Sequence, residues 1–136
     1  MISKSFCKRV DTQTAPEFID ITDWVAQCVA DSAIADGFAV IYSKHTTAAV
    51  KINENEPLLL EDMAVFLEKM SPRENGYKHN DFEIRTVNMN EDESPNGHAH
   101  LQHLLLGTSE TVPVIGGEMQ FGTYKSLSLI HISEPT

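Results

Sequence analysis

The stretch FAVIYSKHTTAAVKINENEPLLLEDMAVFLEKM, residues 38 to 70, contains the patterns of two strands and a helix in direct succession. Residues 38–43 are rich in β-branched and aromatic side chains, which favours a buried strand, and residues 48–53 alternate between apolar and polar. From residue 57 to residue 70 the apolar side chains recur at helical spacing, and proline is tolerated in the first turn of a helix. The stretch therefore predicts strand, strand and helix.

The residues before this stretch add a further strand and helix to the prediction. Residues 3–12 alternate weakly and end in polar side chains, which suits an edge strand. Residues 22–35 carry apolar side chains at helical spacing, with Thr22 as the candidate N-cap and Gly37 just beyond the end. We therefore expect an edge strand followed by an amphipathic helix.

The residues after the stretch begin with a long polar connection. Residues 71–97 are rich in Asn, Asp, Glu, Gly and Pro, and a loop of this length in a compact domain is usually functional or disordered. A short helix over residues 101–107 follows, and then strands broken at Gly116 and Gly117. The order of elements predicts a single α+β domain over residues 1–136, with a largely antiparallel β-sheet, two main helices and a short third one.

Charge and cysteine usage exclude several classes of protein. The chain has 10 Lys and Arg against 20 Asp and Glu, a formal charge of −10, and no basic stripe that could follow phosphates. We therefore expect neither nucleic acid nor an anionic membrane as a partner, and a phosphorylated substrate needs local cations or a metal. Cys7 and Cys28 share no disulfide or zinc-knuckle spacing. Neither the start MISKSFCKRV nor any later stretch has the apolar run of a secretory signal or membrane span, which predicts a cytoplasmic protein.

Three histidines fall within six positions in the stretch NGHAHLQHLLLGTS. In an extended segment, residues two apart point to the same side, so His98 and His100 are placed to chelate a metal. Imidazole suits zinc, copper, nickel and iron, and a third ligand from His79 or His45 would leave one position open for water or substrate. The alternative is a polar loop without a metal. His103 joins the pair only if the chain turns helical near His100.

A second group of polar residues lies at the ends of the two strands predicted first. His45, Thr46 and Thr47 follow the first strand and place several hydrogen-bonding groups at its end, where ligand sites tend to form. Asn53 and Glu54 lie at the end of the second strand, just before a helix N-terminus that favours a phosphate or carboxylate. Alternatively, these last two residues only turn the chain and complement the helix dipole.

The motifs HTTAAVKINENEP, YKHND, NGHAHLQHLLLGTS and SETVPVIGGEMQFGTYKSLSL occur together, in an order and spacing that resemble the YjbQ-like family. The resemblance extends from about residue 16 to about residue 131. It implies a single α+β domain that assembles as a homotrimer and has a polar pocket rich in histidine. The positions that match this pocket are His45, Thr46, Thr47, Asn53, Glu54, His79, Asn96, His98, His100 and Ser109.

Two parts of the chain depart from the family pattern. Where the family usually has Gly-Thr-Trp-Gln, this chain has Gly122, Thr123, Tyr124 and Lys125, which keeps an aromatic ring but adds a positive charge. The end, SLIHISEPT, lacks the acidic strand and the Gly-Pro-Arg tail often seen in relatives. Tyr124 and Lys125 bear on the substrate preference that the resemblance implies only if they border the pocket.

The resemblance also implies an activity, because some members of this family are described as secondary thiamine-phosphate synthases. Such a transferase joins a pyrimidine-methyl pyrophosphate to a thiazole phosphate and releases pyrophosphate. On this hypothesis His79, His98 and His100 hold a divalent metal, zinc or magnesium. The catalytic residues would be His45, as acid or base or as a fourth ligand, together with Thr46, Thr47, Asn53 and Glu54.

A synthase of this kind needs positive charge to stabilise the departing pyrophosphate. The candidate cations are Lys44, Lys51, Arg85 and Lys125, which are scattered along the chain. No dedicated cluster of magnesium-binding carboxylates accompanies them in the sequence. The alternative function is therefore a non-catalytic trimeric module that binds a small anion or a metal.

Overall fold

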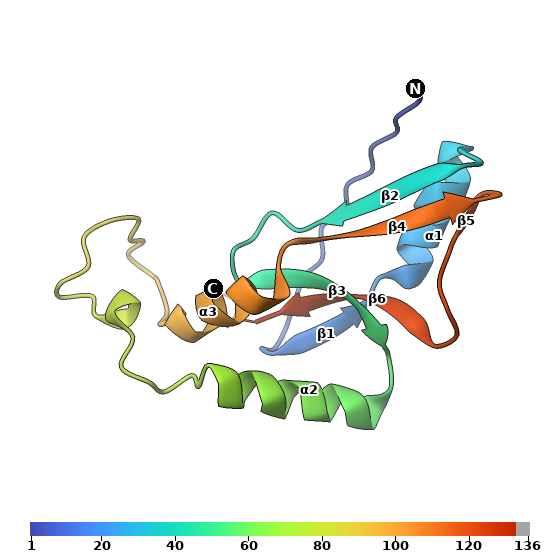
Figure 1. Ribbon diagram of the computed structural model, residues 1–136. Helices are drawn as coiled ribbons and strands as arrows, with labels where there is room; N and C mark the ends of the chain where they lie inside the picture. Colours follow the sequence, from blue (N-terminus) through green and yellow to red (C-terminus); the bar gives the residue numbers. More distant parts are fainter. Residues whose placement is uncertain (133–136) are drawn as a thin grey trace.

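Two three-stranded sheets form the centre of the structure, a computed structural model that describes residues 1–132 (Figure 1). Their strands are β1 (Glu17–Asp20), β2 (Gly37–Tyr42), β3 (Ala48–Glu54), β4 (Ser109–Ile115), β5 (Glu118–Met119) and β6 (Lys125–His131). The first sheet has the order β1-β6-β3 and the second the order β2-β4-β5. Every strand pair in the described part of the chain is antiparallel, which confirms the predicted α+β class with two small sheets in place of one.

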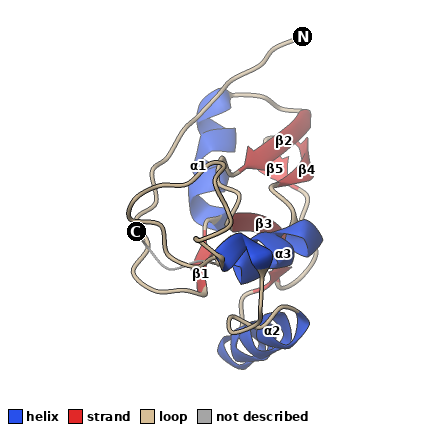
Figure 2. Ribbon diagram, turned by 90° about the vertical axis from the view of Figure 1, so that its left-hand side faces the viewer, coloured by secondary structure: helices blue, strands red, loops and turns tan. Residues whose placement is uncertain are grey.

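Three α-helices and one turn of 3-10 helix complete the fold of the described residues. They are α1 (Thr22–Ser32), α2 (Pro57–Met70), η1 (Lys78–Asn80) and α3 (Gly97–Leu106). Figure 2 shows α1 on one side of the first sheet, with α2 and α3 on the other. Within residues 1–132, no helix is long and apolar enough to cross a membrane.

The main core lies between α1 and the two sheets. Val25 and Val29 of α1 are four residues apart, which puts both on the inward face of the helix. Both sheets contribute alternate residues of their strands to the same core. Its buried members are Ile21, Val25, Val29, Ile41, Val50, Val112, Val114 and Leu127. This core uses one face of the first sheet and leaves the other face to α2 and α3.

The other face of the first sheet carries a smaller apolar cluster under α3. Ala49 of β3 and Ala99 of α3 are both fully buried there, and their small side chains let the helix lie close to the strand. Ile130 and Ile132 complete the cluster. The close packing fixes the position of α3, and hence of the histidines it carries.

The N-terminal part of the chain differs from the prediction. Residues 3–12 form no strand, because the edge position beside β6 is taken by β1. Thr22 is the first residue of α1 and not its cap, and its N–H donates to Asp20 Oδ1 at 2.9 Å. α1 also ends at Ser32, three residues earlier than predicted, because Ala33 adopts a left-handed conformation with φ 59°.

The later elements follow the prediction closely. β2 and β3 begin and end within one residue of the predicted strands, and α2 has the predicted bounds. α3 ends before Gly107 as predicted but begins at Gly97, four residues before the predicted start. β4 and β5 form the predicted hairpin, with Gly116 and Gly117 at positive φ in its turn. Residues 133–136 of the predicted domain and final strand lie outside the described residues.

Candidate functional site

The helical conformation of α3 separates the two histidines that are predicted to chelate a metal together. Residues two apart on an α-helix point about 200° apart, so His98 and His100 face opposite sides of α3. The extended geometry assumed for this pair is therefore wrong. His98 is 2% exposed and lines a hollow between α2 and α3, together with Val65 and Gln102.

Asn96, His100 and His103 instead share one face of α3. Their spacing of four and three residues is that of neighbours on a helix surface. η1 lies next to the first turns of α3 (Figure 1), and the ring centroid of His79 is 4.8 Å from that of His100. The condition under which His103 joins the site is met. We call His79, Asn96, His100 and His103 the histidine cluster.

A close contact at Gly97 holds η1 beside α3. The Gly97 N–H donates to Asn80 Oδ1 at 2.9 Å. A Cβ at this position would lie 2.8 Å from the Cβ of Tyr77 and 3.0 Å from Asn80 Oδ1, so only glycine permits the approach. The Tyr77 hydroxyl donates to the Pro72 carbonyl at 2.6 Å. Tyr77, singled out in the sequence as a neighbour of His79, thus supports the local backbone.

Arg85 and Glu93 brace the long loop beside the histidine cluster. Arg85 donates to the Glu93 carboxylate and to the backbone carbonyls of His79, Val87 and Asn88. These bonds occupy four of the five N–H groups of the guanidinium, so Arg85 has little capacity left for a phosphate. Glu93 Oε1 also lies 3.8 Å from His79 Nε2, which puts a carboxylate at the edge of the cluster.

Several buried polar atoms of the histidine cluster have no hydrogen-bond partner among the described residues. They are His79 Nε2, Asn96 Oδ1 and His103 Nε2. Buried polar groups in folded proteins are nearly always hydrogen-bonded, and exceptions concentrate where a protein binds water, an ion or a substrate. The cluster therefore has hydrogen-bonding capacity for a polar ligand.

The protonation of the cluster follows from its burial and its charges. Burial lowers the pKa of His100 below its ordinary value, and the neighbouring His79, Arg85 and His103 lower it further. A neutral His100 ring has one donor and one acceptor nitrogen. The hydrogen bond from Arg85 holds the pKa of Glu93 below its usual range. A neutral imidazole next to other imidazoles and a carboxylate is suited to proton transfer.

The structure does not bring the predicted catalytic residues together within one chain. His45, Thr46 and Thr47 form the connection from β2 to β3, and the first two are exposed. Asn53 and Glu54 lie at the opposite end of β3, about 20 Å away at the usual rise of a strand. The sequence groups these residues because both sets adjoin one strand, but they adjoin different ends of it.

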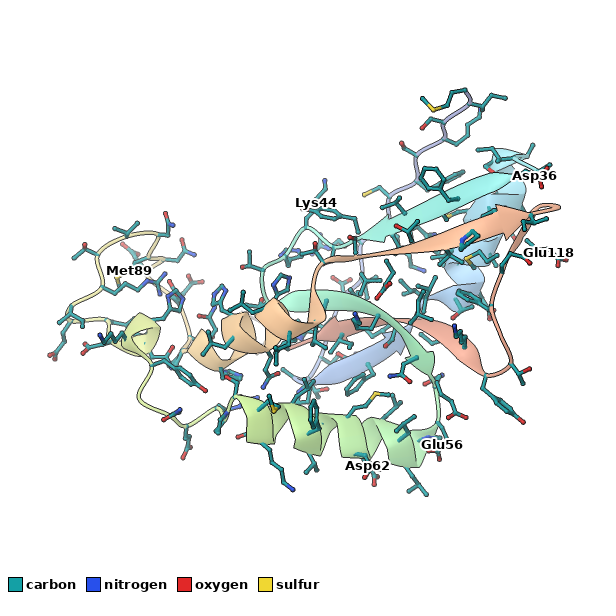
Figure 3. The ribbon with its side chains drawn as sticks, viewed as in Figure 1. Asp36, Lys44, Glu56, Asp62, Met89 and Glu118 are labelled. Carbon is teal, nitrogen blue, oxygen red and sulfur yellow. The ribbon has the colours of Figure 1, made fainter. Side chains whose placement is uncertain are left out.

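The candidate cations are also distributed over the molecule. Lys44 points away from the body of the protein (Figure 3), and Lys51 Nζ lies 3.0 Å from Glu110 Oε1. Lys125 faces Glu54 in the register of β6 and β3. Tyr124 and Lys125, which depart from the family pattern, thus lie at the Glu54 end of the sheet.

The described residues of one chain contain no group of three or more His, Cys, Asp or Glu side chains placed to hold a metal ion. His98 faces away from His79 and His100, so these three side chains do not fit a shared metal within one chain. The assignment of zinc or magnesium to His79, His98 and His100 therefore stays a prediction.

Comparison with known proteins places the chain among relatives along most of its length. Residues 8–136 match the family described as UPF0047 protein YjbQ-like. The chain belongs to the YjbQ-like family. A UPF0047 protein of Archaeoglobus fulgidus is 40% identical over 119 residues, which cover 88% of this chain and 83% of the relative. A UPF0047 protein of Methanothermobacter thermautotrophicus is 38% identical over 124 residues, covering 91% and 79%.

Solved structures of YjbQ-like proteins share this fold. A YbjQ-like protein of unknown function from Sulfolobus solfataricus matches with a TM-score of 0.82 and 33% identity, covering 93% of this chain and 84% of the other. An uncharacterized conserved protein of the YjbQ/UPF0047 family from Clostridium acetobutylicum matches with a TM-score of 0.80 and 32% identity, covering 93% and 89%. These descriptions give the family and no activity, so the function has to be argued from the site.

In the sequence, His103 of this YjbQ-like site is set aside, Glu93 is missed, and Arg85 is named only as a candidate cation. His103 had a usable signal, because Asn96, His100 and His103 follow helical spacing if the helix is started earlier. The pairing of Arg85 with Glu93 had none, since an ion pair inside an irregular polar loop leaves no periodic pattern.

Proposed function

We propose that the protein binds a small phosphorylated molecule at the histidine cluster and has thiamine-phosphate synthase activity there. The reaction joins a pyrimidine-methyl pyrophosphate to a thiazole phosphate. The observation that carries the proposal is the edge-to-face pair of the half-buried His79 and His100, in a cluster that has buried hydrogen-bonding atoms without partners among the described residues. The family resemblance supplies the reaction, and the cluster supplies groups able to serve it.

The chemistry requires one bond to form and one to break. The thiazole nitrogen forms a bond to the methylene carbon of the pyrimidine, and the bond from that carbon to the pyrophosphate oxygen breaks with its electron pair leaving on oxygen. Imidazole N–H groups of His79 and His100 would donate hydrogen bonds to the departing pyrophosphate. Since Arg85 is held by Glu93 and by backbone carbonyls, we expect weak stabilisation and slow turnover.

A second candidate function is a non-catalytic module that binds a small anion. Two of the candidate cations already have ion-pair partners, which favours this function: Lys51 is paired with Glu110, and Arg85 with Glu93. A site without free positive charge holds an anion through hydrogen bonds but contributes little to expelling pyrophosphate.

We also propose that the protein acts as a homotrimer. The outward face of β2, an edge strand of the second sheet, supports this because Phe38, Val40 and Tyr42 are 72%, 58% and 65% exposed. A row of large apolar side chains on an exposed strand is typical of a surface that packs against another protein.

Single-turnover assays with both substrates, read by chromatography of thiamine phosphate, test the catalytic proposal. We expect measurable product with the wild type and a loss of about 100-fold or more in His79→Ala and His100→Ala, the usual range for removing an acid or base. His131→Ala is the control, because His131 contacts the Thr14 carbonyl outside the cluster.

The same preparations distinguish the two candidate functions. Wild-type protein that forms no product, but binds thiazole phosphate by calorimetry in a manner abolished by His79→Ala, would support the binding module. Product formation that is unchanged in both folded histidine variants would remove the histidine cluster from either function.

A further inference from the structure

α2 is fixed to the body of the protein at both ends. At its C-terminal end, Gln102 Nε2 donates to the carbonyl oxygens of Leu67 and Ser71, both at 3.1 Å. Just before its N-terminal end, Asn55 Nδ2 donates to Asp20 Oδ2 at 3.0 Å. Hydrogen bonds at both ends of the helix fix its distance from the sheet.

The sheet beneath α2 carries a row of polar side chains beside the apolar Phe18 and Ile130. The antiparallel register aligns Asp20 of β1, Ser128 of β6 and Lys51 of β3 in one row across all three strands. Asn53 lies opposite Ser126 in the next row on the same face. A sheet face covered by a helix is normally apolar, so this row differs from ordinary packing.

The side of α2 above this row is apolar. Leu60, Met63 and Leu67 recur at helical spacing, and Phe66 lies beside them. The apolar side chains of α2 offer no hydrogen-bonding partners to the hydroxyl and amide groups of this polar row. The two surfaces enclose a cavity of 190 Å³, which we call the α2 cavity.

The size of the α2 cavity limits what fits. An engineered apolar cavity of about 150 Å³ in another protein accommodates benzene. At 190 Å³ the α2 cavity therefore fits a single six-membered ring with a short substituent. A larger dinucleotide or lipid chain exceeds this volume.

The polar groups of the cavity favour a positively charged substituent. Lys51 is paired with Glu110 at 3.0 Å and Lys125 lies opposite Glu54 in the strand register, which leaves Asp20 as the carboxylate available to a cation. Asp20 accepts three hydrogen bonds, from the N–H and hydroxyl of Thr22 on Oδ1 and from Asn55 on Oδ2. A carboxylate has about four acceptor positions, so one remains on Oδ2 for a donor in the cavity.

We infer that the α2 cavity is a second binding site, for a one-ring molecule that carries a protonated amine. The ring lies against Met63 and Phe66 of α2, and the ammonium group donates to Asp20 Oδ2 and to Ser128 of the sheet. The α2 cavity and the histidine cluster share no residue. The inference therefore stands or falls independently of the proposed function.

Three probes of equal size and different charge test this inference: benzylamine, benzyl alcohol and benzoate. Titrations followed by ¹H–¹⁵N NMR give an affinity and the location of each probe. We expect benzylamine to bind about tenfold or more tightly than the other two, with shifts centred on the amides of α2, β1 and β6. Equal affinity for all three probes, or shifts centred elsewhere, would overturn the inference.

Substitutions test which residues of the α2 cavity bind benzylamine. Asp20→Asn keeps an acceptor for Thr22 but removes the charge, and we expect it to weaken benzylamine about tenfold. The matched control is Asp62→Asn, because Asp62 of α2 points away from the sheet (Figure 3). Ser128→Leu fills the cavity floor and should abolish binding in a protein that still melts cooperatively. Undiminished binding in both Asp20→Asn and Ser128→Leu would contradict the site.

The NMR titrations also distinguish a small molecule in the α2 cavity from a second copy of the chain that covers it. If a second copy of the chain covers the cavity, the amides of α2 shift with protein concentration and none of the three probes binds. That result would overturn the small-molecule site.

Discussion

The rings of His79 and His100 meet edge to face, with 4.8 Å between centroids and 80° between planes. The contact joins η1 to α3 and puts two ionisable rings within reach of one ligand. Two imidazoles at this separation disfavour simultaneous protonation, because the second positive charge is repelled by the first. The contact is therefore one of the causes that lower the pKa of His100.

We predict that His100 titrates below the ordinary range of histidine. Burial is the largest cause of its lowered pKa, followed by His79, Arg85 and His103. His79→Gln removes one of these charges and should move the pKa of His100 back toward the ordinary value. NMR of the imidazole C–H signals measures both values, and a His100 that titrates above the ordinary range would contradict the prediction.

The same lowered pKa predicts a loss of stability in mild acid. As the pH falls past the unfolded-state pKa of histidine, the unfolded chain takes up a proton that folded His100 resists, so unfolding becomes more favourable. The stabilising contribution of His100 is complete above its pKa in the unfolded chain. It is lost as the pH falls through the lower pKa that His100 has in the folded protein. Urea unfolding between about pH 7.5 and pH 5.5 should show this slope, and His100→Gln should flatten it. An unchanged slope in the variant would assign the effect to other groups.

Gly97→Ala is predicted to destabilise the protein by about 1–3 kcal/mol, because the new Cβ overlaps Tyr77 at 2.8 Å. The overlap separates η1 from α3 and thereby His79 from His100. Gly76→Ala is the control: a Cβ there meets nothing within 4 Å, so we expect a change within about 0.5 kcal/mol. Chemical denaturation of both variants makes the comparison, and equal effects would argue against the close contact.

Gln102→Ala is predicted to cost roughly 2–4 kcal/mol, because a buried amide is lost and two carbonyls at the end of α2 lose their donor. Hydrogen exchange should report faster exchange along α2 with little change in α1. The side chain of the exposed Gln120 donates to the nearby Glu118 carbonyl, so Gln120→Ala serves as the matched control. Unchanged hydrogen exchange in α2 would show that the hydrogen bonds from Gln102 do not stabilise this helix.

Any metal that the protein binds is predicted to depend on His79 and His100 and not on His98. The orientation of α3 turns His98 to the opposite side of the helix. Elemental analysis after incubation with zinc should show reduced loading in His79→Ala and His100→Ala and unchanged loading in folded His98→Ala. Loss of metal in the His98 variant as well as in the other two would restore the three-histidine assignment.

Val40→Lys is predicted to dissociate the proposed trimer, because it puts a charge in the centre of the exposed apolar row on β2. Ala26→Lys adds the same charge on the exposed side of α1 and should leave the assembly intact. Light scattering during size-exclusion chromatography measures the mass of each variant. A wild type that elutes as a monomer would refute the trimer.

The fold was predictable where local pattern and tertiary packing agree. α2 begins with Pro57 and a glutamate cap and ends where its apolar period ends, so its bounds follow from the sequence. β1 was missed because it spans only Glu17–Asp20 and is defined by pairing with β6 across the length of the chain. A short strand has too few residues to show an alternation.

The site was less predictable, because its geometry depends on one conformational choice. NGHAHLQHLLLG is compatible with an extended start or a helical one, and the choice decides whether His98 or His103 accompanies His100. The packing of Ala99 on Ala49 favours the helix, and that contact is not visible in the sequence. The separation of His45 and Asn53, by contrast, already follows from the predicted strand over residues 48–53, because the two residues adjoin opposite ends of β3.

The exposed edge of β2 has a consequence for handling the protein. β2 is a six-residue edge strand whose unpaired backbone groups can template the addition of further strands, and the exposed Phe38, Val40 and Tyr42 make such an addition more favourable. Self-association that buries this edge would prevent further strand addition. Dilution dissociates the assembly and exposes the edge, so it should make the protein less soluble over time. Storage at high concentration is then the protective condition, opposite to the usual expectation for a small acidic domain.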